Sequence, residues 1–559
     1  MQKLYIHGDS MTLKLFLKNL FKNNFKKIIL IFFLKLLISI FTMISSLVTG
    51  KYIDFLLINK DKSIIYILAY IYILLNFILL VLGYFSNIIH VKYKNDILFE
   101  LINWVLNHVK RLNLDYFNNK NTSYLNDRIN SDCTEVIVFL LDNLMTFILN
   151  VISLLIYILI VININMYIFI FIFMLIPIYY IIYFKFKAPL FKSNLAFKES
   201  QNICYSTMFD QIKEIKFIKS FSLYELMNDQ FKKVFNILME KSIKYIKVSS
   251  LYFSLESIFK TIILSIIFIY GGIQILDNKL SIGEFVILNT YSTGILSLFS
   301  SYLKFGETYN TFKTSRMRLN EILTITEEEN GEIELFNINE IKIRNLKLSY
   351  NNILLFKIKE IILTKGNIYK LSGNNGVGKS SLINILIGLI NNYTGDILFN
   401  GINIKELNMY KIRKRLIGIM DQESKFITDT IENNILLENI NIDTKTINKY
   451  LFKYNFISGI NSELNIKSIL DNNNTLSGGE KQKLSIIRCL LKKSQILFLD
   501  EPTNFLDTKT IKILEEDLIK ISKNSIIIII DHSNKFNNII THNLNIENKT
   551  IYLSENLNI

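Results

Sequence analysis

The sequence predicts an all-α membrane domain of six helices followed by an α/β domain. Half of the 559 residues are apolar and only 20% are charged, whereas soluble domains carry about 25% charged residues. The first part of the chain contains long apolar runs. The second part alternates short β-like runs with polar helical stretches, which is typical of an α/β fold with a largely parallel sheet.

Six apolar runs are long enough to cross the hydrocarbon region of a bilayer, which takes about 20 helical residues. They cover residues 28–48, 64–88, 136–162, 166–184, 251–276 and 285–303. The later isoleucine run 526–530 is too short to span and is predicted to be a buried strand. We therefore expect a membrane domain over residues 1–320, a linker over 321–340 and an α/β domain over 341–559. The linker holds an acidic run that we interpret as solvated.

Basic residues set the expected orientation. They gather in the two long links, 89–135 and 185–250, and are few in the three short ones. Because an excess of Lys and Arg marks the cytoplasmic side, both termini, both long links and the α/β domain are expected inside. The predicted location is the cytoplasmic membrane, with several passes. The net charge of +15 then points to anionic membrane lipid, and no nucleic-acid partner is expected.

The three cysteines give no sign of a metal or redox site. Cys133, Cys204 and Cys489 form no Cys-x-x-Cys pair, so free buried thiols are expected. The basic, amphipathic start of the chain leads directly into the first apolar run. It is interpreted as a cytoplasmic helix before a retained membrane helix and not as a cleavable signal.

The stretch GNNGVGKSS follows a β-like run and precedes a helix, and it fits the phosphate-binding pattern G-x-x-x-x-G-K-[ST]. Backbone N–H groups of such a loop face phosphate oxygens, Lys379 adds a cation near the β- and γ-phosphates, and the Ser380 hydroxyl suits Mg²⁺. ATP with Mg²⁺ is the expected ligand. The predicted loop residues are Gly373, Asn374, Asn375, Gly376, Val377, Gly378, Lys379, Ser380 and Ser381.

Two further buried strands are predicted to carry catalytic groups at their ends. In ILFLDEPT, Asp500 could hold Mg²⁺ through water, and the adjacent Glu501 could act as the general base on an attacking water. His532 follows the isoleucine strand near the ligand edge expected for such sheets. We expect it to contact the γ-phosphate.

A second glycine-rich segment, LSGGE, opens a helix further along the chain. Ser477, Gly478, Gly479 and Glu480 lie at that helix N-terminus, which is itself an anion site. Since the first loop already wraps one side of a triphosphate, this segment could reach the same nucleotide only from the opposite face. The simplest arrangement is a homodimer with two nucleotides between its copies.

These motifs, in this order, resemble the nucleotide-binding domain of an ABC ATPase. The resemblance implies that Tyr350 stacks on adenine, that Gln422 senses Mg²⁺ and the membrane domain, and that Asp507 lies at the dimer contact. The first half resembles a half-size ABC exporter of the multidrug, peptide and lipid branch. Within it, LNLDYFNNKNTSYLNDRINSD resembles the first intracellular loop with its coupling helix, and QIKEIKFIKSFSLYE resembles the second.

The sequence departs from the family pattern in three places. SILDNNN stands where a Gly-Glu-rich segment is usual, Glu480 stands where exporters more often have Gln, and NFLD replaces the commoner Ser-Ala form. None of these departures removes an expected phosphate contact. Both nucleotide sites of the dimer are therefore expected to be competent.

The expected function is ATP-driven export by alternating access, catalysed by an ABC-type ATPase. A peptide of the bacteriocin or lantibiotic kind is the favoured substrate. A lipid flippase, a multidrug pump for amphipathic small molecules, a non-transporting ATP-gated sensor and a soluble ABC ATPase acting on nucleic acid are the alternatives. Charged residues inside the apolar runs are candidates for a functional role. They are Lys35, Asp142 and the pair Glu256 and Lys260, for which mutual neutralisation is the simpler interpretation.

Overall fold

The computed structural model describes residues 13–58, 62–118, 125–126, 128–374, 376–437, 442–456, 467, 469–470, 476–531 and 535–555 without 351–352, with backbone only at positions 176, 179, 300, 303, 307 and 350. These residues form two compact units. The first, the helical unit, is built from Met1–Val109 and Ser123–Thr324. The second, the α/β unit, is built from Lys110–Thr122 and Ile325–Ile559.

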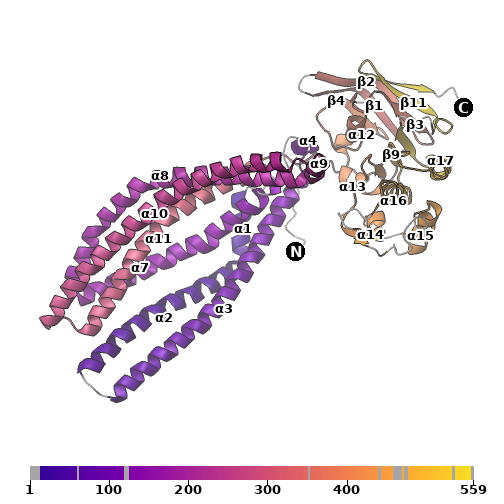
Figure 1. Ribbon diagram of the computed structural model, residues 1–559. Helices are drawn as coiled ribbons and strands as arrows, with labels where there is room; N and C mark the ends of the chain where they lie inside the picture. Colours follow the sequence, from indigo (N-terminus) through magenta and orange to yellow (C-terminus); the bar gives the residue numbers. More distant parts are fainter. Residues whose placement is uncertain are drawn as a thin grey trace. The chain divides into compact units, whose positions relative to one another are not determined.

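Among the described residues, six helices are long and apolar enough to cross a membrane. Each of the six predicted runs lies inside one of them, so the prediction of six spans is confirmed. Five are the helices α2 (Phe25–Ile58), α3 (Lys62–Val109), α8 (Met166–Lys213), α10 (Tyr224–Leu276) and α11 (Ile282–Leu323); the sixth is the combined segment η1 (Arg128–Asp132), α6 (Cys133–Val138), η2 (Phe139–Asn143) and α7 (Leu144–Ile164) (Figure 1).

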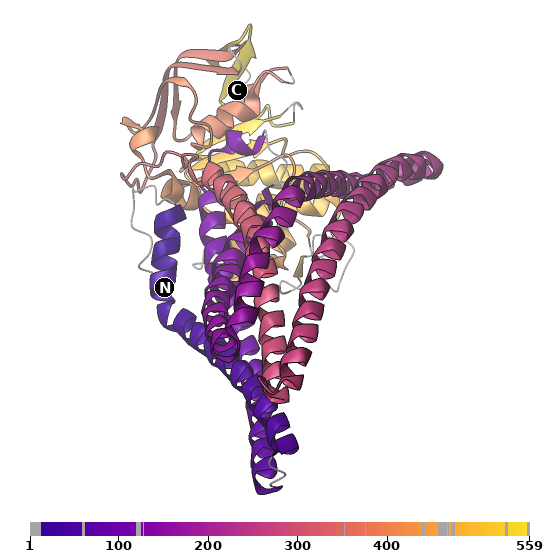
Figure 2. The same ribbon diagram turned by 90° about the vertical axis from the view of Figure 1, so that its left-hand side faces the viewer.

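The helices extend well beyond the predicted runs, and the long links are therefore mostly helical. Helix α3 continues to Val109, α8 continues to Lys213, and α10 begins at Tyr224, with only the short helix α9 (Ile215–Ser220) between the last two. Helices α8 and α10 pack along each other, as α2 and α3 do (Figure 2). The polar ends continue as helices because their backbone hydrogen bonds are satisfied within each helix whatever the surroundings.

Two glycines bring α2 and α11 into close contact. A Cβ atom on Gly283 would lie 2.0 Å from the carbonyl oxygen of Gly50, and one on Gly50 would lie 2.4 Å from Ile287. Asp54 of α2 accepts hydrogen bonds from the Ser281 hydroxyl and the Gly283 N–H, each at 2.7 Å. The carboxylate thus also binds the N-terminus of α11, where an anion is favourable.

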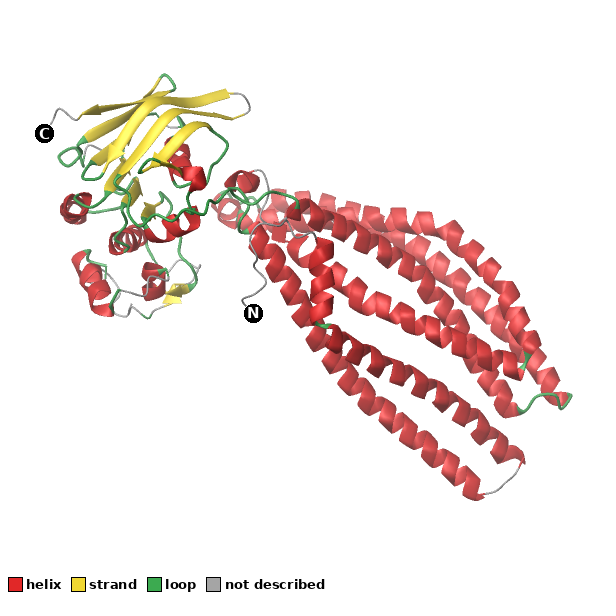
Figure 3. Ribbon diagram, turned by 180° about the vertical axis from the view of Figure 1, so that it is seen from behind, coloured by secondary structure: helices red, strands yellow, loops and turns green. Residues whose placement is uncertain are grey.

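The α/β unit contains a ten-stranded mixed sheet in the order β5-β4-β1-β2-β12-β11-β3-β10-β9-β6. In the described part of the chain, strands occur only in this unit (Figure 3). The strands are β1 (Glu340–Tyr350), β2 (Ile353–Thr364), β3 (Ile368–Ser372), β4 (Thr394–Phe399), β5 (Ile402–Asn403), β6 (Ile417–Met420), β9 (Ile496–Asp500), β10 (Ile526–Ile530), β11 (His542–Glu547) and β12 (Thr550–Glu555), with a separate pair β7 (Asp429–Thr430) and β8 (Ile469–Leu470).

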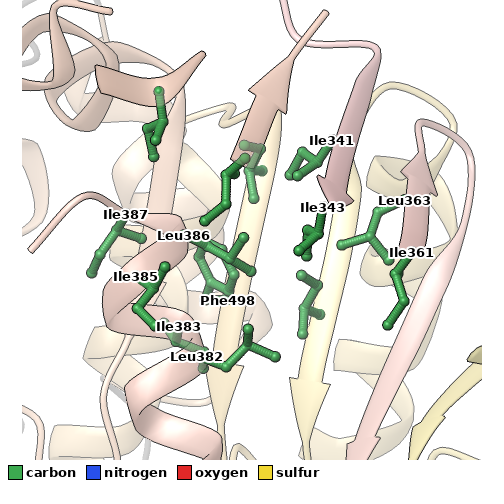
Figure 4. Packing of buried hydrophobic residues seen from close by; sticks show 14 of the residues in the cluster. Ile341, Ile343, Ile361, Leu363, Leu382, Ile383, Ile385, Leu386, Ile387 and Phe498 are labelled. Atoms are coloured by element: carbon green, nitrogen blue, oxygen red, sulfur yellow. The ribbon is translucent and has the colours of Figure 1, made fainter. Parts of the chain in front are cut away.

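Helices pack against this sheet and bury its central strands β9 and β10. They are α12 (Lys379–Leu386), α13 (Met409–Arg415), α14 (Ile431–Leu436), α15 (Thr444–Lys453), α16 (Gly478–Leu491) and α17 (Thr508–Ser522). Figure 4 shows Leu382 and Leu386 of α12 beside Phe498 of β9 and Ile343 of β1, in one buried cluster. The predicted isoleucine strand is β10, and all five of its side chains are buried, as expected for a central strand.

The first loop of the membrane region folds with the α/β unit. Residues 110–118 include the short helix α4 (Leu114–Asn118) and belong to this unit. The Glu328 N–H donates to the Arg111 carbonyl oxygen at 2.7 Å, and Leu112 forms a β-bridge with Glu327. The start of the segment that resembles a first coupling loop, at Leu112, therefore packs against the acidic run.

Most of that acidic run is exposed, as expected for a solvated linker, but Glu328 is an exception. Glu328 forms a bidentate pair with the Arg413 guanidinium at 2.7 and 3.2 Å, and its side chain is only 10% exposed. Glu334 pairs with Lys411. The basic partners on α13 lie about eighty residues away in the sequence. No local sequence pattern could therefore predict these ion pairs.

Candidate nucleotide site

Four parallel strands bring the predicted site residues to one edge of the sheet. Strand β10 pairs in parallel with β3 on one side and with β9 on the other, and β6 pairs in parallel with β9. The chain leaves the carboxyl ends of these strands at Gly373, Asp500, Asp531 and shortly before Gln422. The crevice outside such strand ends is where ligands bind in open α/β sheets.

The glycine-rich loop joins β3 to α12 in a conformation that only glycine adopts readily. Gly376 and Gly378 have φ angles of 81° and 99°, in the left-handed region. A Cβ atom on Gly378 would also lie 2.6 Å from Leu355. Helix α12 starts directly after it, so Ser380 and Ser381 fall in the first turn, where free N–H groups face an anion.

Lys379 turns back over this loop. Its ammonium donates to the Gly373 carbonyl oxygen at 2.7 Å and to the Asn374 carbonyl oxygen at 3.4 Å. Partial burial lowers the pKa of Lys379, while the charges of Asp500 and Glu501 act in the opposite direction. The structure thus brings the loop lysine and the two acidic residues into one electrostatic neighbourhood, as the sequence predicted.

The Glu501 carboxylate lies between two amide side chains. Its Oε2 accepts a hydrogen bond from Gln422 Nε2 at 2.8 Å and from Asn504 Nδ2 at 2.6 Å. Two donors on one oxygen fix the orientation of the carboxylate. Asn504 belongs to NFLD, so this departure from the commoner Ser-Ala form supplies a contact that the sequence comparison did not anticipate.

The backbone of Glu501 is also held on both sides. Its N–H donates to the Ile530 carbonyl oxygen at 2.8 Å, and its carbonyl oxygen accepts from Gln482 Nε2 at 3.0 Å. Gln482 is 3% exposed and lies on α16. The φ of Glu501 is 50°, which is uncommon for a residue with a side chain. Gln482 was missed in the sequence, because its distance from Glu501 along the chain gives no periodic signal.

The LSGGE segment forms the N-terminus of α16, as predicted. Ser477 is the N-cap, and Glu480 N donates to its Oγ at 3.3 Å. Glu480 Oε2 accepts from the Ser477 N–H at 2.7 Å and from its hydroxyl at 2.8 Å. This reciprocal arrangement is a capping box. Glu480 therefore caps the N-terminus of α16. The Ser477 hydroxyl now donates to Glu480 and would have to rotate to donate to a bound anion.

The NFLD segment packs against the same helix start. Atoms of the Phe505 ring lie 3.6 to 3.8 Å from where a Cβ atom on Gly478 would stand, and the Phe505 carbonyl oxygen lies 2.9 Å from such an atom on Gly479. The Phe505 side chain itself is 78% exposed. Asp507 caps α17 by accepting from Thr510 N–H at 2.7 Å, and these Thr510 hydrogen bonds lower its pKa.

Three predicted residues cannot be placed in this site. His532 and Asn375 lie outside the described residues. Tyr350 is the last residue of β1, and its side chain is outside the described part. Most of SILDNNN is likewise outside, apart from Ile469 and Leu470 in β8. The residue before His532 is described: the buried Asp531 carboxylate accepts a hydrogen bond from the Thr503 hydroxyl at 3.4 Å.

The oxygen donors at this edge fit Mg²⁺. The predicted set is the Ser380 hydroxyl, the Gln422 amide and the Asp500 carboxylate, and Mg²⁺ is typically held by one or two carboxylates together with substrate phosphates and water. In the described residues, no group of three or more His, Cys, Asp or Glu side chains forms a metal cage.

The charged residues predicted as functional candidates in the helical unit fall into two groups. Asp142, in the π-helical turn η2, accepts from His90 Nε2 and from Lys94 Nζ, each at 2.6 Å. Lys35 interacts electrostatically with Asp142 and Lys94, so two residues predicted separately belong to one cluster. Glu256 and Lys260 form an ion pair at 2.7 Å, which supports the neutralising interpretation. The three cysteines are free and buried, as expected.

Comparisons with known proteins agree with this architecture. The family profile of the ABC transporter transmembrane region matches residues 28–299, and the ABC transporter profile matches residues 357–504. The lactococcin-G-processing and transport ATP-binding protein of Lactococcus lactis subsp. lactis is 26% identical over 507 residues, which cover 89% of this chain and 72% of that protein.

Two further relatives extend the comparison. The ATP-dependent lipid A-core flippase of Syntrophus aciditrophicus is 26% identical over 340 residues, covering 58% of this chain and 55% of that protein. In fold, the chain is similar to a bacterial Atm1-family ABC exporter with ATP bound, with a TM-score of 0.80, 17% identity and 96% of both chains covered. Three findings indicate the same family: the six apolar spans, the motifs along one sheet edge and the two profile matches. The chain belongs to the ABC transporter family, as an exporter-type member whose transmembrane region is fused to its ATPase domain.

Proposed function

We propose that this ABC exporter moves a peptide out across the cytoplasmic membrane and works as a homodimer. The observation that carries the peptide assignment is the extent of the matches. The lactococcin-G relative aligns with 89% of the chain, which includes most of both halves, whereas the lipid A-core flippase aligns with 58%. Since the membrane region faces the transported molecule, similarity over both halves is the stronger support.

ATP hydrolysis is proposed to take place at the described sheet edge. The loop after β3 and Lys379 would bind the phosphates, and Ser380, Gln422 and Asp500 would hold Mg²⁺, which offsets phosphate charge when bound. Glu501 would accept a proton from the attacking water. A new P–O bond then forms at the γ-phosphorus while the bond to the β-phosphate oxygen breaks, giving ADP and phosphate. The two amides on Glu501 Oε2 support this role, because they orient the carboxylate.

The homodimer is supported by the surface around LSGGE. The start of α16 would be a second anion site. The adjacent Phe505 is 78% exposed, and aromatic side chains are enriched in protein interfaces. A second copy would cover this surface and would supply LSGGE to the facing nucleotide.

Coupling is proposed to run through the first loop. Residues 110–118 belong to the α/β unit and bond to the Glu327–Glu328 backbone, yet they follow α3 with no break in the chain. A rearrangement of the ATPase domain would therefore act directly on the cytoplasmic end of a membrane helix. This would link domain closure to alternating access.

The dimer is tested by disulfide cross-linking of the full-length protein carrying Asn374→Cys and Ser477→Cys. The native thiols are buried, and burial raises the pKa of Cys489 to about 11, so they should not interfere. The expected result is a covalent dimer on oxidation in the double variant and in a mixture of the two single variants. If oxidation gives no covalent dimer, in the double variant or in the mixture of single variants, the homodimer is contradicted.

Substrate class is tested by transport into inside-out proteoliposomes. Candidate peptides, fluorescent phospholipids and amphipathic dyes are offered with Mg-ATP, with a Glu501→Gln protein as the control for energy coupling. We expect ATP-dependent peptide uptake and peptide-stimulated ATPase activity. Movement of phospholipid alone would favour the flippase, and ATP binding with no vectorial movement of any substrate would favour a sensor.

A further inference from the structure

An open groove of about 280 Å³ lies at the start of the helical unit, away from the nucleotide site. Helix α1 (Leu13–Asn23) forms one side, and the remainder comes from η2 and α11. Its floor is apolar and its rim is basic. The lining residues are Lys14, Leu17, Lys18, Phe21, Leu140, Phe312 and Arg316, which we call the α1–α11 groove.

The sequence of α1 explains how the groove forms. Leu13, Leu17 and Leu20 are buried on one face, as a spacing of three or four residues dictates. Phe16 stacks on Trp104 of α3, with ring centroids 4.1 Å apart. The helix is thus fixed against the bundle, while Lys14 and Lys18 remain exposed beside the apolar floor.

The opposite wall is equally fixed. Phe312 of α11 stacks on Phe139 of η2, with centroids 4.5 Å apart. One helical turn further, Arg316 adds the third cation. Among the residues that the structure describes, no carboxylate lines the groove, and Asp142 of η2 is already paired with His90 and Lys94. Three cations therefore face an apolar floor with no anion among the lining residues.

This combination selects an amphipathic anion. An apolar ligand alone would not need the cations, and a free phosphate would gain nothing from the leucine and phenylalanine side chains. The volume is slightly below the ~300 Å³ of the smallest drug-sized sites, which suits part of an acyl chain below a headgroup. Helix α1 directly precedes the first membrane span, as interfacial amphipathic helices with basic polar faces do.

We propose that the α1–α11 groove binds an anionic phospholipid of the inner leaflet, with its phosphate at Lys14, Lys18 and Arg316 and an acyl chain on Leu17, Phe21, Leu140 and Phe312. The choice of leaflet rests on the proposed cytoplasmic orientation of α1. The lipid bridges α1 to α11, the last membrane helix before the α/β unit. Its binding therefore stabilises the membrane end of the connection to the ATPase domain.

The test uses full-length protein in phosphatidylcholine vesicles containing a phosphatidylglycerol analogue with a photoreactive diazirine in its acyl chain. After irradiation, peptides are analysed by mass spectrometry. We expect labelling of segments 13–23 and 312–316. In Lys14→Gln/Lys18→Gln/Arg316→Gln, labelling should fall at least about tenfold, because the phosphate loses its charge-assisted hydrogen bonds in the groove.

The matched control is Lys22→Gln/Lys26→Gln/Lys313→Gln. It removes the same charge from the same region, but none of its residues lines the groove, so labelling should stay close to that of the parent. An equal loss in both triple variants would mean diffuse attraction to the membrane surface and would overturn the proposal. Equal labelling by a phosphatidylcholine analogue would also overturn it, because the headgroup would then not be recognised.

Two further arms complete the test. Soluble glycerol phosphate in excess should not reduce labelling, and complete competition by it would assign the cations to a free phosphate. The single variant Arg316→Gln is analysed in parallel, in case the triple variant does not fold. Its labelling should fall while its ATP binding is retained, and unchanged labelling in a folded Arg316→Gln protein would contradict the lipid site.

Discussion

The Gln422 side-chain amide donates a hydrogen bond to Glu501 Oε2 at 2.8 Å. These residues follow β6 and β9, neighbouring parallel strands, and are 79 positions apart in the sequence. The residue expected to sense Mg²⁺ and the membrane domain is therefore in direct contact with the proposed general base. This contact lets a change around Gln422 reach the hydrolytic centre without any intermediate residue.

Replacement Glu501→Gln should abolish hydrolysis while leaving ATP binding intact. The amide keeps the shape of the side chain but cannot accept the proton, so kcat should fall at least about 100-fold. Steady-state phosphate release and equilibrium binding of a labelled ATP give the two readouts. Glu516→Gln makes the same chemical change at an exposed position of α17 and should retain parent activity. Turnover of Glu501→Gln at the parent rate would refute the base assignment.

Replacement Gln422→Ala should raise the Mg²⁺ concentration needed for half-maximal hydrolysis. It removes both a proposed oxygen ligand and one donor to Glu501, and changes of this kind around a metal cost about 10–100-fold in affinity or activity. The measurement is ATPase activity against Mg²⁺ at constant total ATP. An unchanged Mg²⁺ dependence would show that Gln422 is not a Mg²⁺ ligand. A lower kcat with that dependence unchanged would show that Gln422 acts only by orienting Glu501.

Replacement Gln482→Met should lower kcat with little effect on ATP affinity. Methionine fills a similar buried volume but leaves the Glu501 carbonyl oxygen without its partner, at a cost of about 1–3 kcal/mol. The strained backbone at Glu501 would then be less well fixed. Comparison of kcat with ATP binding separates this positioning role from a loss of folding, which would lower both kcat and the amount of ATP bound. Parent kinetics in a folded variant would contradict it.

The charge cluster on η2 predicts a coupled response of Asp142 and Lys94. Asp142→Asn should lower the thermal unfolding temperature, because the half-buried Lys94 ammonium then loses its carboxylate partner. The double variant Asp142→Asn/Lys94→Gln should recover part of the loss. A double-mutant cycle by thermal unfolding in detergent measures the interaction. Additive effects of the two changes would show that the pair contributes nothing.

The contact between α2 and α11 predicts a sharp difference between two glycines. Gly283→Ala should destabilise the protein by about 1–3 kcal/mol, the usual cost of overpacking, since its Cβ would overlap the Gly50 carbonyl. Gly272→Ala is the matched control on α10, where a Cβ meets open space; it should gain roughly 0.5–1 kcal/mol from helix preference. The yield and thermal stability of monodisperse protein check both. Equal behaviour would contradict the close approach.

The sequence by itself determined the six spans, the separate α/β domain and the phosphate loop. These depend on local properties: twenty or so apolar residues make a helix in lipid wherever they occur, and glycines at fixed offsets make one kind of loop. The isoleucine strand and the LSGGE helix start could be predicted for the same reason. The full extent of α3, α8 and α10 could not, because their polar ends lack the apolar signal.

Only the tertiary structure decided which distant residues meet. It placed Gln422, Gln482 and Asn504 around Glu501, joined Asp142 to His90 and Lys94, and paired Glu328 with Arg413. Sheet order and helix packing set these contacts, and neither leaves a periodic trace along the chain. A hydrogen bond or ion pair depends on distances of about 3 Å between side chains, and that distance is fixed only once the whole domain has folded.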